Sequence, residues 1–578
     1  MLLLLFLLFG NTVLQINSQI STVLDDGLSS AVGDAKGPRP QPEVCAKAGC
    51  VRGKFVSGLI KPYEAFYGIP YAEPPVGMLR FENPVPFSGW SGYWDATYTR
   101  DVCLQRDVFK PDLPILGSED CLYLNVYRPL TWKKGKNLPV LVFIPGGAFT
   151  SWSGDPTLFG PEYFMGNGEI ILVTLNYRLG IFGFLSSGDG VVKGNFAFKD
   201  QQLALQWVKT NIKFFGGDKN SITVSGQSAG AAGTHLQLLS PKSQDLFHRA
   251  IMMSGTAITS ILYPIDFAAQ FRSSAKYLGI LNWDTDTTLS LTNQMKNTDA
   301  LDILLLADNF YVFPGTPASP WRVCVEGNWE GAFITEDPRK TWLEGNFVQK
   351  PILTSLVSNE GFIQLTLFNE TLRQSFNENI YELLGVQLDI DPRYVPDIMR
   401  HYFGSKTYID ETNLHKYFEM FGDRLFRYPF FKLVQQYLRY ADLEKNPIYL
   451  TEFGFESALT FFKSNEYLGV AHSDDLIYLF SSADFPPLEP NSPEGRMSDI
   501  LVQTIVNFVA RGEVKAWTNF TPCTPETSTP FCDRQEFLRN HRSNPDQVIV
   551  KINNYIDLQM VKLWDDIEND VNSTPQKL

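Results

Sequence analysis

Short apolar runs recur along most of this 578-residue chain, and stretches with helical spacing lie between them. Runs of apolar and β-branched residues predict buried strands at residues 138–144, 169–175, 222–224, 351–356 and 447–451. Residues 200–214 and 497–510 carry apolar side chains at the spacing of amphipathic helices. Strands interleaved with helices are typical of a mostly parallel sheet that helices cover on both faces. The pattern therefore predicts an α/β fold built on a large central sheet.

The same pattern divides the chain into four segments. Residues 1–18 begin with the apolar run MLLLLFLLF, which is too short to cross a bilayer and fits a secretory signal peptide, although a basic start is missing. Residues 19–44 are polar, and we expect them to form a flexible lead-in, a segment that precedes the folded domain. From 45 to 565 no break or repeat appears, so we expect a single domain there, with a surface excursion at 515–545. Residues 566–578 read as a polar tail.

Composition narrows the possible partners. The net charge of −14 argues against nucleic acid, because a polyanion is bound by basic surfaces. After the N-terminal run, no stretch of 18 uninterrupted apolar residues follows, and the last residues are polar, so we expect no stable membrane anchor. Aromatic residues make up 13% of the chain, enough to line an apolar cavity as well as a core. Nothing in the pattern predicts an oligomeric state.

The cysteines and the glycosylation sequons fit an exported protein. Local spacing suggests the pairs Cys45–Cys50, Cys103–Cys121 and Cys523–Cys532, with Cys324 left as a buried thiol, although spacing alone does not fix the pairing. Sequons stand at Asn369, Asn519 and Asn572. Together with the apolar N-terminus, these features predict a secreted, extracellular glycoprotein.

The strongest chemical signal is Gly226-Gln227-Ser228-Ala229-Gly230, between an apolar strand and a helical stretch. A serine on a sharp strand-to-helix turn is the pattern of a nucleophile elbow, in which small residues relieve crowding around the turn. The turn exposes the hydroxyl above a helix N-terminus, where anionic intermediates are stabilised. Gly-x-Ser-x-Gly alone is common, and the flanking strand and helix single it out. We therefore predict that Ser228 is a nucleophile.

A serine hydroxyl needs a base and the base needs an orienting acid. Of the 6 histidines, His472 follows a strand and a glycine on a predicted loop, and it comes after the serine, as this elbow requires. His235 and His248 fit better as packing residues in or near helices. Glu360 directly follows the strand at 351–356 and precedes a glycine, which places it at the same sheet edge. The predicted triad is Ser228, Glu360 and His472.

The oxyanion of the reaction needs amide donors, which contribute about 3–4 kcal/mol. Residues 144–149 place a glycine turn immediately after a strand and upstream of the elbow, where the second donor loop belongs. We predict the N–H groups of Gly147, Ala148 and Ala229 as donors. No zinc ligand set, P-loop or dinucleotide fingerprint occurs, so the sequence predicts no metal and no cofactor.

These motifs together resemble the type-B carboxylesterase and cholinesterase family of α/β-hydrolases, from about residue 48 to 565. Family-like segments stand at 67–75, 80–81, 118–125, 176–178 and 200–201. The resemblance implies an α/β-hydrolase fold with a deep active-site gorge, a Cys103–Cys121 disulfide and an Arg80–Glu119 ion pair. It also implies the same triad.

The departures from the family pattern bear on the substrate. The family usually has glutamate where this chain has Gln227, and cholinesterases have a tryptophan in the loop that here runs from Cys103 to Cys121, which has none. Both changes argue against choline esters, because charge attraction and cation–π contact are lost. Pro145 replaces the usual His or Tyr before the glycines, and Ala148 replaces a third glycine but keeps its N–H. We predict Gln227 and Phe149 as substrate contacts.

Within the family, the Gln-containing elbow is similar to that of the insect juvenile hormone esterases, together with Arg80-Phe81, Asp200-Gln201 and the Gly469-to-Asp475 pattern. That similarity implies a secreted serine esterase that cleaves the methyl ester of a lipophilic hormone in haemolymph. The main alternative is a general insect carboxylesterase for dietary, pheromone or xenobiotic esters. A remote alternative is a non-catalytic adhesion protein of the same family. The predicted partner is thus a small lipophilic ester.

Overall fold

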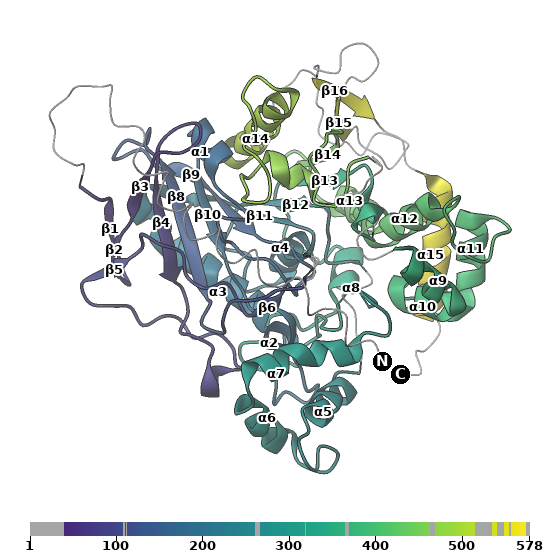
Figure 1. The fold of residues 1–578 in the computed structure, drawn as a ribbon. Coiled ribbons are helices and arrows are strands. Elements are labelled where there is room, and N and C mark those ends of the chain that lie inside the picture. The colour runs from purple at the N-terminus through teal and green to yellow at the C-terminus, as the bar shows by residue number, and fades with distance from the viewer. Residues whose placement is uncertain are drawn as a thin grey trace, which may run out of the picture. The chain divides into compact units, whose positions relative to one another are not determined.

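The predicted strands form the centre of one large sheet (Figure 1). The computed structural model describes residues 40–107, 110, 112–259, 266–317, 319–364, 369–462, 469–514, 534–539, 548–553 and 557–573. Within them, eleven strands pair in the order β16-β15-β14-β13-β12-β11-β9-β10-β8-β4-β3. Their bounds are β3 (Lys54–Val56), β4 (Tyr63–Pro70), β8 (Tyr123–Pro129), β9 (Leu138–Ile144), β10 (Ile171–Leu175), β11 (Gly217–Gln227), β12 (Arg249–Met253), β13 (Ile352–Val357), β14 (Ile448–Gly454), β15 (Arg534–Arg539) and β16 (Val548–Asn553).

The sheet is parallel at its centre and antiparallel at both edges. The pairs from β10 through β9, β11, β12, β13 and β14 to β15 are parallel. The pairs β10–β8, β8–β4, β4–β3 and β15–β16 are antiparallel. The prediction of a large α/β sheet is confirmed, with a mixed rather than uniform strand direction. β15 lies within residues 515–545, the predicted surface excursion, but it is a strand of the sheet between β14 and β16, and Phe537 is 1% exposed. For residues 534–539 that prediction is wrong.

Helices cover the two faces, as the continuous apolar strands require. In β9, Val140, Val142 and Ile144 share a core with α3 (Phe196–Asn211) and α4 (Ala229–Leu239). Leu141 and Phe143 point the other way, into a second core with α14 (Pro493–Arg511) and α1 (Glu162–Asn167). Alternation along each strand therefore separates the core into two layers. The apolar run at 138–144 is continuous because both of its faces are buried.

A third apolar cluster lies in a group of helices beside the sheet (Figure 1). It is formed by α9 (Glu370–Glu378), α10 (Ile380–Leu388), α11 (Val395–Phe403), α12 (Leu414–Gly422) and α15 (Leu558–Ser573). Trp564 of α15 is fully buried there, and α15 runs across residue 565, the predicted end of the domain. The remaining helices are α2 (Gly180–Phe184), α5 (Phe267–Tyr277), α6 (Thr288–Lys296), α7 (Ala300–Leu305), α8 (Pro338–Leu343) and α13 (Tyr428–Tyr440).

Both disulfides among the described residues match predicted pairs. Cys45 and Cys50 join β1 (Glu43–Ala46) to β2 (Gly49–Arg52), which pair with β5 (Tyr93–Asp95) in a small sheet. Cys103 and Cys121 close a loop that includes the short strands β6 (Gln105–Arg106) and β7 (Ile115–Leu116). Cys324 is free and buried. Cys523 and Cys532 lie outside the described residues.

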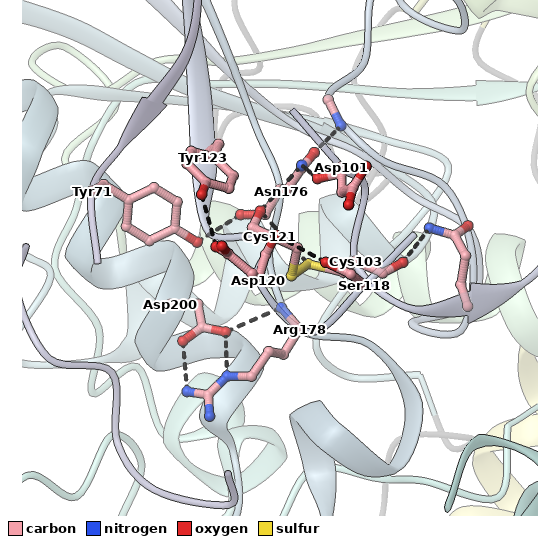
Figure 2. Close-up of a disulfide and its surroundings, with 12 residues drawn as sticks. Tyr71, Asp101, Cys103, Ser118, Asp120, Cys121, Tyr123, Asn176, Arg178 and Asp200 are labelled. Atoms are coloured by element: carbon pink, nitrogen blue, oxygen red, sulfur yellow. Dashed lines mark hydrogen bonds and ion pairs between the residues drawn. A yellow bond between two sulfur atoms is a disulfide. The ribbon is translucent and has the colours of Figure 1, made fainter. Parts of the chain in front are cut away.

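The family-like segments meet around the second disulfide (Figure 2). Asn176 donates to the Cys121 carbonyl at 3.2 Å, and its own carbonyl accepts from the Tyr71 hydroxyl at 2.6 Å. Close by, Arg178 forms a two-pronged ion pair with Asp200 at 2.7 and 2.8 Å. The predicted Arg80–Glu119 pair also forms, at 2.6 Å. Apart from the partly exposed Glu119, these polar groups are buried, and all of them are paired, which is the condition for keeping charges inside a core.

Three further predictions concern the ends and the surface. The signal peptide at 1–18, residues 19–39 of the lead-in and Asn519 lie outside the described residues, as does the side chain of Asn572. Asn369 is exposed and caps α9, where its side-chain oxygen accepts from the Leu372 N–H at 2.9 Å. In the part of the chain that the structure describes, no helix has the length and apolarity needed to span a bilayer.

Candidate active site

Ser228 occupies the sharp turn between β11 and α4. Its backbone is strained, with φ of 55° and ψ of −122°. A Cβ atom added to Gly226 would lie 2.1 Å from the Gly230 carbonyl oxygen, and one added to Gly230 would lie 2.1 Å from that of Ile144. Both contacts are far below van der Waals distance, so only glycine fits at either position. The turn has the geometry of the predicted nucleophile elbow.

Glu360 and His472 meet through a short hydrogen bond. The Nδ1 atom of His472 lies 2.6 Å from Glu360 Oε2, and the two side chains are 2% and 0% exposed. The other carboxylate oxygen, Oε1, accepts from the N–H of Val357 at the end of β13, at 2.9 Å. A charge-assisted hydrogen bond of this kind fixes the ring orientation and keeps the Nδ1 proton on the side of the carboxylate. The opposite nitrogen, Nε2, then carries the lone pair of the neutral ring.

Backbone contacts hold these two side chains together. The N–H of Asn359 donates to the Val470 carbonyl at 3.0 Å, which joins the loop after β13 to the loop that carries His472. Gly469 has a φ of 105°, and a Cβ atom there would lie 2.4 Å from the Asn359 side-chain oxygen. Asp474 accepts from the N–H groups of Ala471 and Phe461 at 2.8 and 3.0 Å. The histidine loop is therefore fixed on both sides of the imidazole.

Gln227 links the elbow to the imidazole. Its side-chain Nε2 lies 3.2 Å from His472 Nε2 and 2.9 Å from the Ser473 hydroxyl oxygen. Because Gln227 immediately precedes Ser228, the imidazole lies beside the elbow. The Gln227 side chain is fully buried. The structure thus brings together Glu360, His472 and Gln227, the residue immediately before Ser228. Ser228 itself is partly exposed.

The predicted oxyanion loop runs against the elbow. A Cβ atom on Gly146 would lie 3.2 Å from that of Ser228, and Gly147, Ala148 and Phe149 all have positive φ, at 93°, 54° and 61°. The Gly147 carbonyl accepts from the N–H groups of Thr150 and Ser151, both at 2.9 Å. The described part of the chain offers no acceptor to the N–H groups of Gly147, Ala148 and Ala229. Three amide donors are thus available near the serine.

Two buried aromatic side chains accompany the predicted oxyanion loop: Tyr177 contacts it and Phe149 belongs to it. Tyr177 donates its hydroxyl to the Pro145 carbonyl at 2.8 Å, which anchors the start of the loop despite the proline. Phe149 is 3% exposed and packs against Phe184 and Phe198, with ring centroids 5.1 and 5.5 Å apart. The aromatic ring of Phe149 thus belongs to the core cluster in this structure.

The carboxyl groups behind the imidazole are strongly affected by burial. Asp474 and Asp475 begin the short 3-10 helix η8 (Asp474–Tyr478), and burial raises the pKa of each to about 7. For Asp475, the nearby Glu360 carboxylate raises the pKa further, and His472 opposes that effect. The Asp475 Oδ1 atom has no hydrogen-bond partner among the described residues. Asp475 also lines a small cavity between β12–β15 and α14.

Sequence reasoning missed two residues beside the site, Phe426 and Ser473. Phe426 lies on the π-helical turn η7 (Asp423–Arg427), and its ring centroid is 4.5 Å from that of His472. No local pattern marks a π-helical turn, and the contact joins residues far apart in the chain. Ser473 had a weak signal, since it directly follows His472. Among the described residues, no group of three or more His, Cys, Asp or Glu side chains is placed to hold a metal ion.

An elbow at the carboxyl end of a central strand, with an acid–histidine pair beside it, defines the class of α/β-hydrolases. The carboxylesterase family model matches residues 40–543, and the chain belongs to that family. It is a carboxylic ester hydrolase.

Similar proteins include insect esterases. Juvenile hormone esterase of Tribolium castaneum is 34% identical over 514 residues, which cover 83% of this chain and 83% of that protein. Esterase FE4 of Myzus persicae is 34% identical over 470 residues, or 78% of this chain and 80% of that one. The crystal structure of juvenile hormone esterase from Manduca sexta, with OTFP covalently attached, superposes with a TM-score of 0.79 at 27% identity. The match covers 92% of this chain and 100% of that chain.

Proposed function

We propose that Ser228, His472 and Glu360 are the catalytic triad, and that the chain hydrolyses esters through an acyl-enzyme. His472 Nε2 removes the proton from Ser228 as its oxygen attacks the ester carbonyl carbon. Glu360 orients the imidazole and stabilises the imidazolium. The N–H groups of Gly147, Ala148 and Ala229 bind the oxyanion. The alcohol leaves with a proton from His472, and water then releases the acid from Ser228.

The 2.6 Å contact between Glu360 and His472, beside the strained elbow, carries this proposal. Replacing Ser228 with alanine removes the nucleophile and leaves the fold in place. We expect Ser228→Ala to reduce kcat for naphthyl acetate by about 10⁴-fold or more. Ser225→Ala is the matched control, because Ser225 is a buried serine of β11, the strand that leads into the elbow, and its hydroxyl bonds only the Val142 carbonyl among the described residues. Parental activity in Ser228→Ala would refute the assignment.

For the substrate, we propose the methyl ester of juvenile hormone. Two of the similar proteins named above are juvenile hormone esterases, and both match over most of both chains. The loop from Cys103 to Cys121 contains no tryptophan to stack on a choline group, which supports an uncharged substrate over a choline ester. Esterase FE4 is equally similar to this chain and favours the second candidate, a general insect carboxylesterase.

Comparing kcat/KM for juvenile hormone, naphthyl acetate and a choline ester separates these candidates. We expect the hormone to have the highest kcat/KM, by at least tenfold. Comparable values for the hormone and naphthyl acetate would favour the general carboxylesterase. A preference for the choline ester would contradict both.

We also propose that the protein is exported. The two disulfides support this, because such bonds persist in oxidising compartments. The exposed Asn369 at a helix start is open to glycosylation. Expression in insect cells should deliver an active enzyme to the medium whose mass falls on treatment with a glycosidase. Retention of all activity inside the cells would contradict export.

A further inference from the structure

Gln227 makes an unusual contact with the proposed base. Its amide group lies 3.2 Å from His472 Nε2, the nitrogen that has to accept the Ser228 proton. The same amide lies 2.9 Å from the Ser473 hydroxyl, and Ser473 is itself fully buried in a left-handed turn with φ of 75°. The far oxygen of the amide, Oε1, has no partner among the described residues. Gln227 is therefore held between the elbow and the histidine loop.

An amide is suited to a nitrogen that changes its protonation state. Neutral imidazole presents a lone pair at Nε2, to which an amide N–H can donate. Imidazolium presents an N–H at Nε2, from which the amide oxygen can accept a hydrogen bond once the amide group has flipped. A carboxylate can only accept hydrogen bonds, and a thioether is only a weak acceptor. Of these three groups, only the amide serves both states of the imidazole without adding a charge.

We propose that Gln227 is a positioning residue, whose amide holds the His472 ring beside Ser228 in both protonation states. This inference rests on the proposed triad and goes beyond it, since it takes Gln227 out of the substrate contacts. A side chain that is fully buried and hydrogen-bonded to two residues of the histidine loop acts on the ester only through the imidazole.

The charges around the imidazole make the site sensitive to a carboxylate at this position. Glu360 from the turn after β13 bonds Nδ1, and Asp475 from η8 lies near both of them. Asp474 is turned toward backbone N–H groups of its own loop. From η7, Arg427 bonds the Ser358 carbonyl near Glu360. A new anion at Nε2 would stabilise the imidazolium and raise the pH at which the base is freed.

The test measures kcat and KM for naphthyl acetate from pH 5 to 9 in Gln227→Met and Gln227→Glu. Methionine keeps the volume and removes the hydrogen bonds, so we expect kcat to fall about tenfold with KM unchanged. Glutamate should move the acidic midpoint of the kcat/KM profile upward by about one pH unit or more. Gln237→Met is the matched control. Gln237 is a fully buried glutamine of α4 that bonds the Phe198 carbonyl and Gln201, and its loss should leave kcat and the midpoint unchanged.

Either a Met variant that keeps the parental kcat or a Glu variant whose midpoint stays in place would overturn the proposal. If Gln227→Met fails to fold, Ser473→Ala removes the other partner of the amide and should lower kcat severalfold. Ser228→Ala, assayed in parallel, separates the two hypotheses. An active Ser228→Ala refutes the triad, whereas an inactive one beside a fully active Gln227→Met refutes the role of Gln227 alone.

Discussion

At the scale of single residues, burial decides whether a reactive group reacts. The Cys324 thiol is 3% exposed, and burial raises its pKa to about 12, with a smaller contribution from the Glu326 carboxylate. The thiolate is the nucleophilic form of cysteine, so almost none of it is present at pH 8. We expect no alkylation of Cys324 by iodoacetamide in the native protein, measured by peptide mass spectrometry, and full alkylation in urea. Rapid labelling of the native protein would contradict this placement.

Gly361 lies where the turn that carries Glu360 packs against α12. It follows Glu360, and a Cβ atom there would lie 1.7 Å from the Phe418 carbonyl oxygen of α12. Gly361→Ala has to push α12 or Glu360 away, so we expect at least a hundredfold loss of kcat and a lower unfolding temperature. Gly279→Ala is the control, because Gly279 has open space around it, and its φ of 72° adds a backbone cost that Gly361 does not have. Equal effects of the two substitutions would show that crowding at Glu360 is unimportant.

The elements explain which parts of the site could be predicted. The elbow depends on five consecutive residues, and glycines at fixed offsets report the crowding of the turn directly. The proposed acid and base could be predicted because each follows a predicted strand. The contacts of Gln227 and Phe426 with His472 could not be inferred, because they depend on how a loop after β14 and a π-helical turn pack across the sheet edge. Local sequence patterns carry no information on such long-range packing.

At the scale of the whole molecule, strand order assembles the site. β11, β12, β13 and β14 are consecutive neighbours and all parallel, so their carboxyl ends share one edge of the sheet. Ser228 follows β11, Glu360 follows β13, and His472 comes after β14. Residues separated by more than a hundred positions thus meet at this edge. Of the three, only Ser228 has a strained backbone. This edge is where α/β sheets usually carry their ligands.

The C-terminal helix supports this assembly from the side. Trp564 of α15 is fully buried and donates to the Tyr402 hydroxyl at 3.2 Å, in the same cluster as Phe418 and Ala471. Trp564→Ala should destabilise the protein by about 3–5 kcal/mol, because it leaves a large cavity. The measurement is the thermal unfolding midpoint. Leu558→Ala is the control on the same helix, since Leu558 is 61% exposed, and an equal loss in both would show that α15 is only loosely attached.

The buried carboxyl groups make the stability of the whole protein depend on pH. Burial, together with the Glu360 carboxylate, raises the pKa of Asp475 to about 7 from its ordinary 3.8. Between these values the folded chain keeps a proton that the unfolded chain has lost, so the stability that Asp475 contributes falls as the pH rises from about 4 to about 7. Above pH 7 the folded protein carries the full cost of this buried charge, on the order of a few kcal/mol.

Asp475→Asn removes that charge and keeps the shape of the protonated acid. We expect the variant to unfold at a higher temperature than the parent at pH 8, and at the same or a lower temperature at pH 5. Asp302→Asn, at an exposed carboxylate of α7, should show no such difference between the two pH values. If Asp475→Asn were destabilised equally at pH 5 and pH 8, the ionised carboxylate would have to be making favourable contacts in the folded protein. That result would place a cation or strong donors beside Asp475 Oδ1, the atom that has no partner among the described residues.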